Sequence, residues 1–150
     1  VLPSRIKLLA GNTRRLGGVA LVVGADGTRP PFRPMSFDRV LLDAPCSGLG
    51  VLRRRADARW RISATDVTEL VDLQRRLLDA AAPLVKPGGL LVYSVCTLTA
   101  AESTEHPVPD GFRAEAPDDA RWRRCGDGVR ILPQDHDTDG MTVRVFRRDG

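Results

Sequence analysis

The sequence predicts an α/β fold, in which a β-sheet with parallel strands carries helices on its faces. Three continuous apolar runs have the length of strands, and such runs are typical of parallel strands that are buried on both sides. A long segment with helical periodicity lies between the second and third runs, which gives the strand–helix–strand order of this fold class. The three runs occupy residues 19–23, 37–42 and 90–95.

The first expected element is a helix, because apolar residues recur at roughly helical spacing over residues 6–16. Ser4 is a suitable N-cap residue, and Gly17 and Gly18 form a typical helix end. The first apolar run follows directly as a strand. A loop rich in Gly and Pro is expected at 24–34, before the second strand.

The second strand, 37–42, is expected to be buried on both faces at its end, and the residues after it to be irregular. The long helix begins near Ser63, which forms a pattern similar to a capping box with Asp66. The Lys-Pro-Gly-Gly turn at 86–89 ends that helix before the third strand. A Pro-rich stretch and a late pair of strands are then expected at 107–117, 129–132 and 141–147.

The composition is that of one globular domain, taken as residues 1–150, with 42% apolar and 28% charged residues. No apolar run approaches the roughly 20 residues that span a bilayer, and the start has no signal-peptide layout. We therefore expect a cytoplasmic monomer with no membrane partner. The three cysteines fit no zinc pattern, and the two histidines have no metal-ligand spacing, so no metal is expected and both histidines are expected to be exposed.

A basic cluster lies in the middle of the chain, whose net charge is +4. Such a cluster is a solvated face about as often as it is a nucleic-acid contact. The tryptophan inside it, Trp60, could stack on a base, but packing is the more frequent role of such a residue. The cluster consists of Arg53, Arg54, Arg55, Arg59 and Arg61.

Candidate chemistry follows two of the predicted strands. Asp43 and Cys46 come after the second strand, and Cys96 comes after the third. Ligands of open α/β sheets bind at the carboxyl ends of strands, so these three side chains are expected to converge at one edge. A lone cysteine is more often a small buried apolar residue, but two of them in matching positions favour function. Cys125 has no such context.

Two motifs resemble the Nop/Sun family of RNA 5-methylcytosine methyltransferases, and the RsmB-like branch of that family most closely. They are Asp-Ala-Pro-Cys-Ser-Gly at 43–48 and Tyr-Ser-Val-Cys-Thr at 93–97. The stretch at 50–60 and the tail at 132–141 are also similar to the family. The paired Pro-Cys and Cys-Thr motifs are the specific part of this resemblance.

The resemblance implies a Rossmann-like class I methyltransferase sheet that is incomplete, because the family's first two strands and its cofactor loop have no counterpart here. The chain is then expected to be the C-terminal part of one catalytic domain, with residues 1–30 loosely attached. The implied cofactor is S-adenosyl-L-methionine, and its implied contacts are Asp26, Asp43 and Pro45. A plain turn residue before Gly27 is nearly as good an explanation of Asp26.

The resemblance also implies covalent catalysis. Cytosine C5 is a poor nucleophile, and addition of a thiolate to C6 activates it towards the methyl group of the cofactor. Cys96 is the implied nucleophile, Cys46 the residue that helps release the product, and Asp43 a contact to the base or cofactor. The substrate is RNA, with 16S ribosomal RNA favoured and transfer RNA the alternative, and the arginine cluster would bind its phosphates.

Two other hypotheses remain open from the sequence. The first is a non-catalytic RNA-binding module that uses the arginine cluster. The second is a thiol hydrolase that pairs Cys96 with His106, which is disfavoured because the sequence offers no oxyanion loop or orienting partner.

Overall fold

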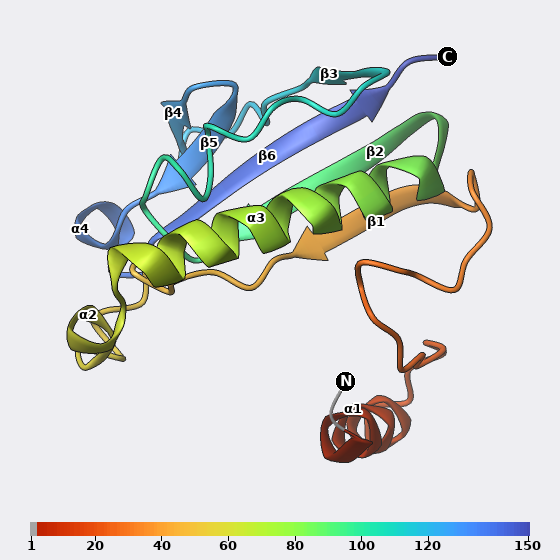
Figure 1. Ribbon diagram of the computed structural model, residues 1–150, viewed down its shortest axis with the longest axis horizontal. Helices are drawn as coiled ribbons and strands as arrows, with labels where there is room; N and C mark the ends of the chain where they lie inside the picture. Colours follow the sequence, from red (N-terminus) through yellow and green to blue (C-terminus); the bar gives the residue numbers. More distant parts are fainter. Residues whose placement is uncertain (1–2) are drawn as a thin grey trace.

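A mixed six-stranded sheet forms the centre of the protein, in a computed structural model that describes residues 3–150 (Figure 1). Only the pair β1–β2 is parallel, and the later strands pair in antiparallel fashion. The sheet order is β1-β2-β6-β5-β4, with β3 also on β6. The strands are β1 (Phe37–Asp43), β2 (Val85–Val95), β3 (Phe112–Ala114), β4 (Arg123–Cys125), β5 (Gly128–Ile131) and β6 (Met141–Arg148).

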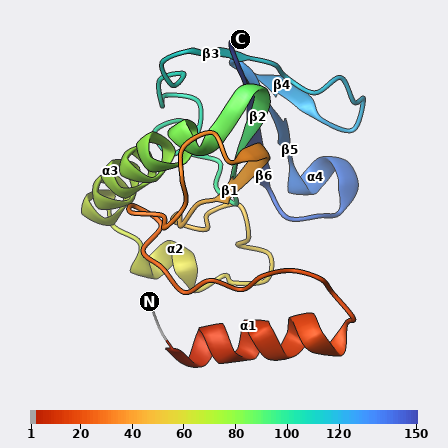
Figure 2. The same ribbon diagram turned by 90° about the vertical axis from the view of Figure 1, so that its right-hand side faces the viewer.

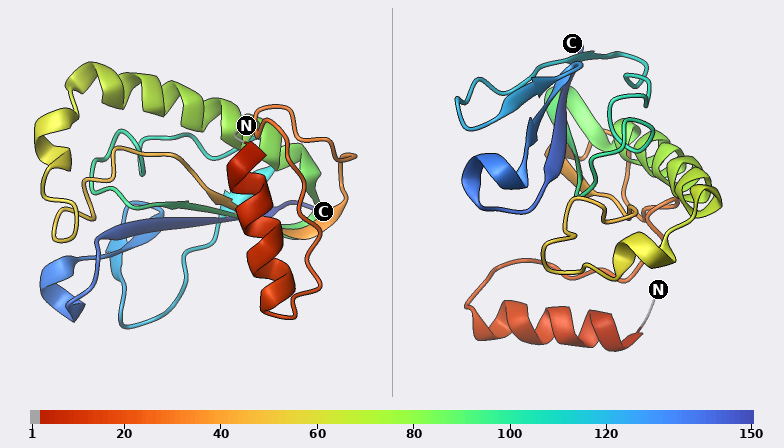
Figure 3. Two further views of the ribbon diagram at one scale, coloured as in Figure 1. Left: turned by 90° about the horizontal axis from the view of Figure 1, so that it is seen from below. Right: turned by 90° about the vertical axis from the view of Figure 1, so that its left-hand side faces the viewer.

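The long helix α3 (Ala64–Ala81) packs along one face of this sheet (Figures 1 and 3). Its start confirms the predicted cap, because the Ser63 hydroxyl accepts from Asp66 N at 3.2 Å and the Asp66 carboxylate accepts from Ser63 N at 2.8 Å. Its buried face meets β1 and β2 in the core. The remaining helical segments are α1 (Pro3–Arg15), α2 (Ala58–Arg61), the 3₁₀ turn η1 (Ala82–Leu84) and α4 (Pro133–His136).

The parallel pair β1–β2 sets up the site. Leu42 lies opposite Tyr93, and Asp43 opposite Ser94, so both strands end at the same edge of the sheet. The prediction that the end of β1 is buried on both faces is wrong, because Leu41 is 69% exposed. β1 is the terminal strand of the sheet, so the face that alternates away from α3 meets solvent.

The predicted strand at 19–23 is also wrong. These residues have no strand assignment, and Val19 and Leu21 are largely exposed. A strand needs a neighbour to satisfy its backbone groups, and no described strand lies beside this run. The helix α1 before it has no buried residue and lies apart from the sheet (Figure 2).

The boundaries differ at three further places. α1 begins at Pro3, so Ser4 lies in its first turn instead of at the N-cap, while Gly17 ends the helix with a φ of +65° as expected. β2 begins at Val85, so the turn at 86–89 is an irregularity inside the strand instead of a helix end. The late pair is confirmed, since Val129 lies opposite Val143 in β5 and β6. None of the helices in residues 3–150 is both long and apolar enough to cross a membrane.

Candidate active site at the ends of β1 and β2

A cavity of about 560 Å³ opens where β1 and β2 end and the chain turns towards α2. The sequence-predicted residues Asp43, Pro45, Cys46 and Cys96 all line it. Convergence at this edge was expected because parallel strands place their carboxyl ends side by side. Asp43 and Pro45 are exposed, whereas both thiols are half-buried.

The two thiols contact each other, with 3.4 Å between Cys46 Sγ and Cys96 Sγ. Backbone hydrogen bonds hold their loops together, from Ala44 N to Ser94 O and from Gly50 N to Cys96 O, both at 3.0 Å. Gly50 also has no room for a side chain, because a Cβ there would lie 2.2 Å from the carbonyl oxygen of Gly140. The loop after β1 therefore folds tightly over the end of β2.

The protonation of Cys46 follows from this position. Burial, together with the neighbouring Cys96 sulfur, raises the pKa of the Cys46 thiol to about 12. At neutral pH Cys46 is therefore a thiol that can donate its hydrogen to the sulfur of Cys96. The geometry thus places a protonated Cys46 within reach of the Cys96 sulfur.

A buried carboxylate below the thiols was missed by sequence reasoning. Glu102 is fully buried, and it accepts hydrogen bonds from the hydroxyls of Ser47 at 2.6 Å and Thr97 at 2.9 Å. Ser47 follows Cys46 and Thr97 follows Cys96 in the chain. The one signal in the sequence was an acid a few residues beyond Cys96, in a loop with two threonines, and that pattern is common on surfaces.

A second polar layer continues behind Glu102. Gln74, from α3, donates to the Pro45 carbonyl at 2.8 Å and lies 3.0 Å from His106 Nε2, and the Tyr93 hydroxyl donates to the Glu102 carbonyl at 2.7 Å. The prediction that His106 is exposed is wrong, since it is 2% exposed. Burial and the nearby Arg144 charge lower the pKa of His106 to about 4.

This arrangement contradicts the thiol-hydrolase hypothesis. The ring of His106 contacts Gln74 through Nε2, and its Nδ1 has no partner within residues 3–150. Cys96 pairs with Cys46 instead of a histidine. Cys125 lies in β4 and does not line the cavity.

Asp26 lies outside this cavity. It is exposed, and its carboxylate accepts from the backbone N–H and the hydroxyl of Thr28 at 2.9 and 2.8 Å. These hydrogen bonds lower the pKa of Asp26. The geometry is that of a turn-forming aspartate, and β1 and β2 do not bring it to the thiols.

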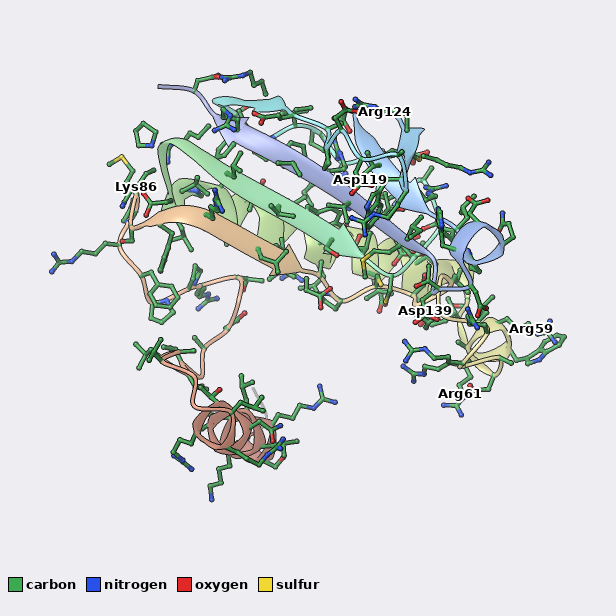
Figure 4. All side chains as sticks on the ribbon, turned by 180° about the vertical axis from the view of Figure 1, so that it is seen from behind. Arg59, Arg61, Lys86, Asp119, Arg124 and Asp139 are labelled. Atoms are coloured by element: carbon green, nitrogen blue, oxygen red, sulfur yellow. The ribbon has the colours of Figure 1, made fainter. Side chains whose placement is uncertain are left out.

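The arginine cluster lies on and before α2, which carries the labelled Arg59 and Arg61 in Figure 4. Arg55 and Arg61 line the cavity, and Arg59 lies with its guanidinium carbon 4.9 Å from the ring centre of Trp60. Trp60 is 79% exposed, so the packing role expected for it is wrong. Ion pairs join Arg53 to Asp137, Arg54 to Asp139 and Arg61 to Asp57. Arg55 has no ion pair among the residues that the structure describes.

No group of acidic, histidine and cysteine side chains that could hold a metal ion occurs in residues 3–150. The mixed α/β sheet matches solved methyltransferase structures over part of their length. A methyltransferase homologue from Pyrococcus horikoshii superimposes with a TM-score of 0.75 at 24% identity, over 97% of this chain and 50% of its own. The structure of NSun6 from the same organism, solved with SFG, gives a TM-score of 0.86 at 26% identity, over 99% of this chain and 40% of its own.

The sequence narrows this class to a family. It matches 16S rRNA methyltransferase RsmB/F over residues 2–147. A putative methyltransferase of Mycobacterium tuberculosis is 42% identical over 97% of this chain, and ribosomal RNA small subunit methyltransferase B of Vibrio vulnificus is 39% identical over 95%. The chain therefore belongs to the RsmB/F family, whose members use S-adenosylmethionine. It spans about a third of the length of these relatives, 33% and 34% respectively.

Proposed function

We propose that this chain is the catalytic part of an S-adenosylmethionine-dependent enzyme that methylates cytosine C5 in RNA, with 16S ribosomal RNA as the substrate. The single observation that carries the proposal is the contact of 3.4 Å between the thiols of Cys46 and Cys96 at the carboxyl ends of two parallel strands. One thiol suffices to bind a base covalently, so a second thiol in contact with it calls for a separate task.

In the proposed reaction Cys96 is the nucleophile. Its sulfur bonds to C6 of the cytosine, and the electron pair of the C5–C6 double bond moves to C5. C5 would then take the methyl group from S-adenosylmethionine, which would leave as S-adenosylhomocysteine; a base removes the C5 proton, the C5–C6 double bond re-forms and Cys96 leaves as a thiolate. The raised pKa keeps Cys46 a thiol at neutral pH, so its S–H can hydrogen-bond to the Cys96 sulfur and stabilise the charge on it as it leaves.

The cavity suits the reacting end of the methyl donor. S-adenosylmethionine supplies an electrophilic methyl group, and the volume of about 560 Å³ lies within the usual range of small-molecule sites, roughly 300–1,000 Å³. Asp43 and Pro45 are exposed at its wall and would contact donor or base. Asp26 is proposed only for the distant adenine end, since it does not line this cavity.

We propose that residues 1–150 are one part of a Rossmann-like class I sheet, and that further strands pair with the free edge of β1. The exposure of that edge supports this, because open strand edges are normally covered or blocked. The exposed apolar residues of 19–23 would gain a ladder partner in the same way.

The test is a pair of substitutions in the intact protein. Cys96→Ala should lower RNA methylation roughly 10³-fold or more and form no covalent complex. Cys46→Ala should accumulate an RNA–protein adduct that survives a denaturing gel, while Cys125→Ala, outside the cavity, should behave as wild type. Methyl transfer by Cys96→Ala would refute the assignment. The non-catalytic RNA-binding module would be favoured by two results together. The wild-type protein would not methylate RNA, and the variant without both cysteines would still bind it.

A further inference from the structure

Five hydrogen-bond donors converge on the buried carboxylate of Glu102. Besides the Ser47 and Thr97 hydroxyls, the Thr99 hydroxyl donates to Oε2 at 2.8 Å. Oε1 accepts from the backbone N–H of Ser47 at 2.7 Å and from Gln74 Nε2 at 3.2 Å. The donors come from the loop after β1, the loop after β2 and the helix α3. One side chain thus ties three parts of the chain together.

The charge of Glu102 is retained in this setting. Burial by itself would raise its pKa, but the hydrogen bonds from Ser47, Thr99 and Thr97 outweigh burial and leave the pKa below its ordinary value. An ionised carboxylate is an acceptor only, which matches a shell made only of donors. Burying a charge costs several kcal/mol unless such bonds offset it, so a neutral core would be cheaper if stability were the sole purpose.

We infer that Glu102 is a positioning residue that holds Cys46 and Cys96 in contact. Two of its partners are the residues that directly follow the cysteines, Ser47 and Thr97. Each thiol is therefore one residue away from a bond to the same carboxylate. The importance of this contact for catalysis rests on the proposed function, whereas the positioning itself does not.

The negative charge adds an electrostatic effect to the geometric one. Besides burial and the contact with Cys96, the charge of Glu102 disfavours the thiolate form of Cys46. The same group therefore sets the distance between the sulfurs and helps to keep the second one protonated. This matches the hydrogen-bonding role proposed for the Cys46 thiol, and no reacting atom touches Glu102 itself.

A thiol–disulfide equilibrium tests this positioning without RNA or cofactor. In buffers of reduced and oxidised glutathione, the two thiols give their hydrogens to the two sulfurs of oxidised glutathione and form one protein disulfide. The equilibrium constant measures the effective concentration of one thiol at the other. Peptide mapping by mass spectrometry would report the Cys46–Cys96 bond in the intact protein at pH 7, in the wild type, Glu102→Gln and the exposed matched control Glu105→Gln.

Glu102→Gln should lower the effective concentration by roughly tenfold or more, because the amide cannot accept from all five donors and the loops separate. Glu105→Gln should match the wild type. A folded Glu102→Gln protein with the wild-type effective concentration overturns the inference, because a Glu102 that only stabilises the fold would not change this equilibrium. A wild-type protein that forms no Cys46–Cys96 disulfide overturns it as well. If Glu102→Gln does not fold, Ser47→Ala decides in the same way, with a several-fold loss expected.

Activity separates this inference from the proposed function. If the equilibrium shifts as expected while the wild type never methylates RNA, the positioning stands and the enzyme assignment fails. If methylation occurs, Glu102→Gln should lower kcat and leave KM for RNA nearly unchanged, since the arginines at the rim are untouched. An unchanged kcat would contradict the catalytic importance of the held pair.

Discussion

The two sides of the thiol pair are built on opposite principles. On the interior side, Glu102 and Gln74 are fully buried and bonded to named partners on three segments. On the solvent side, the paired arginines are themselves 40% or more exposed, and in the pair of Arg53 with Asp137 the side chains are 40% and 94% exposed. Buried hydrogen bonds hold a geometry, whereas exposed charges attract a partner and rearrange to fit it. The site thus combines a rigid floor, which consists of Glu102, Gln74 and their hydrogen-bond partners, with an adaptable rim, which consists of the arginine cluster.

The largest expected effect on stability is a loss in the free energy of unfolding at acidic pH, caused by the buried His106 on the interior side. His106 is neutral in the folded protein with a pKa of about 4, against about 6.5 when unfolded. As the pH falls, the unfolded chain takes up the proton on His106 before the folded protein does. The free energy of unfolding is therefore unaffected by the titration of this histidine above pH 6.5 and falls by about 3 kcal/mol in all as the pH drops towards 4. Urea unfolding at a series of pH values would measure it.

The control for this prediction is the other histidine. His136→Gln, at an exposed position, should leave the pH dependence unchanged, whereas His106→Gln should flatten it between pH 6.5 and 4. Equal slopes for wild type and His106→Gln would show that the buried ring does not titrate as described.

A smaller effect is expected from the loop that joins floor and rim. Gly50→Ala would place a Cβ against the Gly140 carbonyl and the Cys96 carbonyl, so the loop must move. We expect a loss of about 1–3 kcal/mol in the free energy of unfolding. The rate at which iodoacetamide alkylates Cys96 should also differ from the wild-type rate, because the loop that packs over this residue has moved. Gly11→Ala, in a helix with open space around it, should be neutral or stabilising.

If Gly50→Ala kept both the wild-type stability and the wild-type thiol reactivity, the close packing of the loop over Cys96 would be refuted. Chemical denaturation and the alkylation rate of the Cys96 peptide are the two measurements. The comparison with Gly11 separates steric contact from the general effect of removing a glycine.

The smallest effect on stability is expected at the rim. Arg55→Ala should change the free energy of unfolding by less than about 0.5 kcal/mol, yet weaken RNA binding and reduce its salt dependence by about one unit of slope. Arg53→Ala should weaken binding less, because Asp137 already neutralises that side chain. Binding titrations over a series of salt concentrations would measure both variants. Equal losses of RNA affinity would show that the ion pair with Asp137 does not weaken the contribution of Arg53.

The thiol pair could be predicted from the sequence, and the buried floor beneath it could not. The motifs around Asp43, Cys46 and Cys96 placed these residues at one strand edge, since the ends of parallel strands coincide. Glu102 and His106 escaped prediction because their burial depends on loops that fold back over β2 and β6. A single acid or histidine in a polar segment carries no periodic signal of burial.

The errors at the N-terminus have the same origin. The apolar run at 19–23 has the local composition of a strand, but strands form by pairing, and no described neighbour offers a ladder. Likewise, the run of β1 reads as buried on both faces, and only its place at the end of the sheet exposes Leu41. Local patterns cannot report which neighbours are present.

The sequence by itself determined the α/β class, the capped helix α3 and the two thiols after two strands, because spacing, capping and short motifs are properties of contiguous residues. The tertiary structure alone decided that the sulfurs touch, that Glu102 lies beneath them, and which arginines of the cluster lack an ion pair among residues 3–150. Those outcomes depend on contacts between residues far apart in the chain, and such contacts exist only once the sheet has assembled.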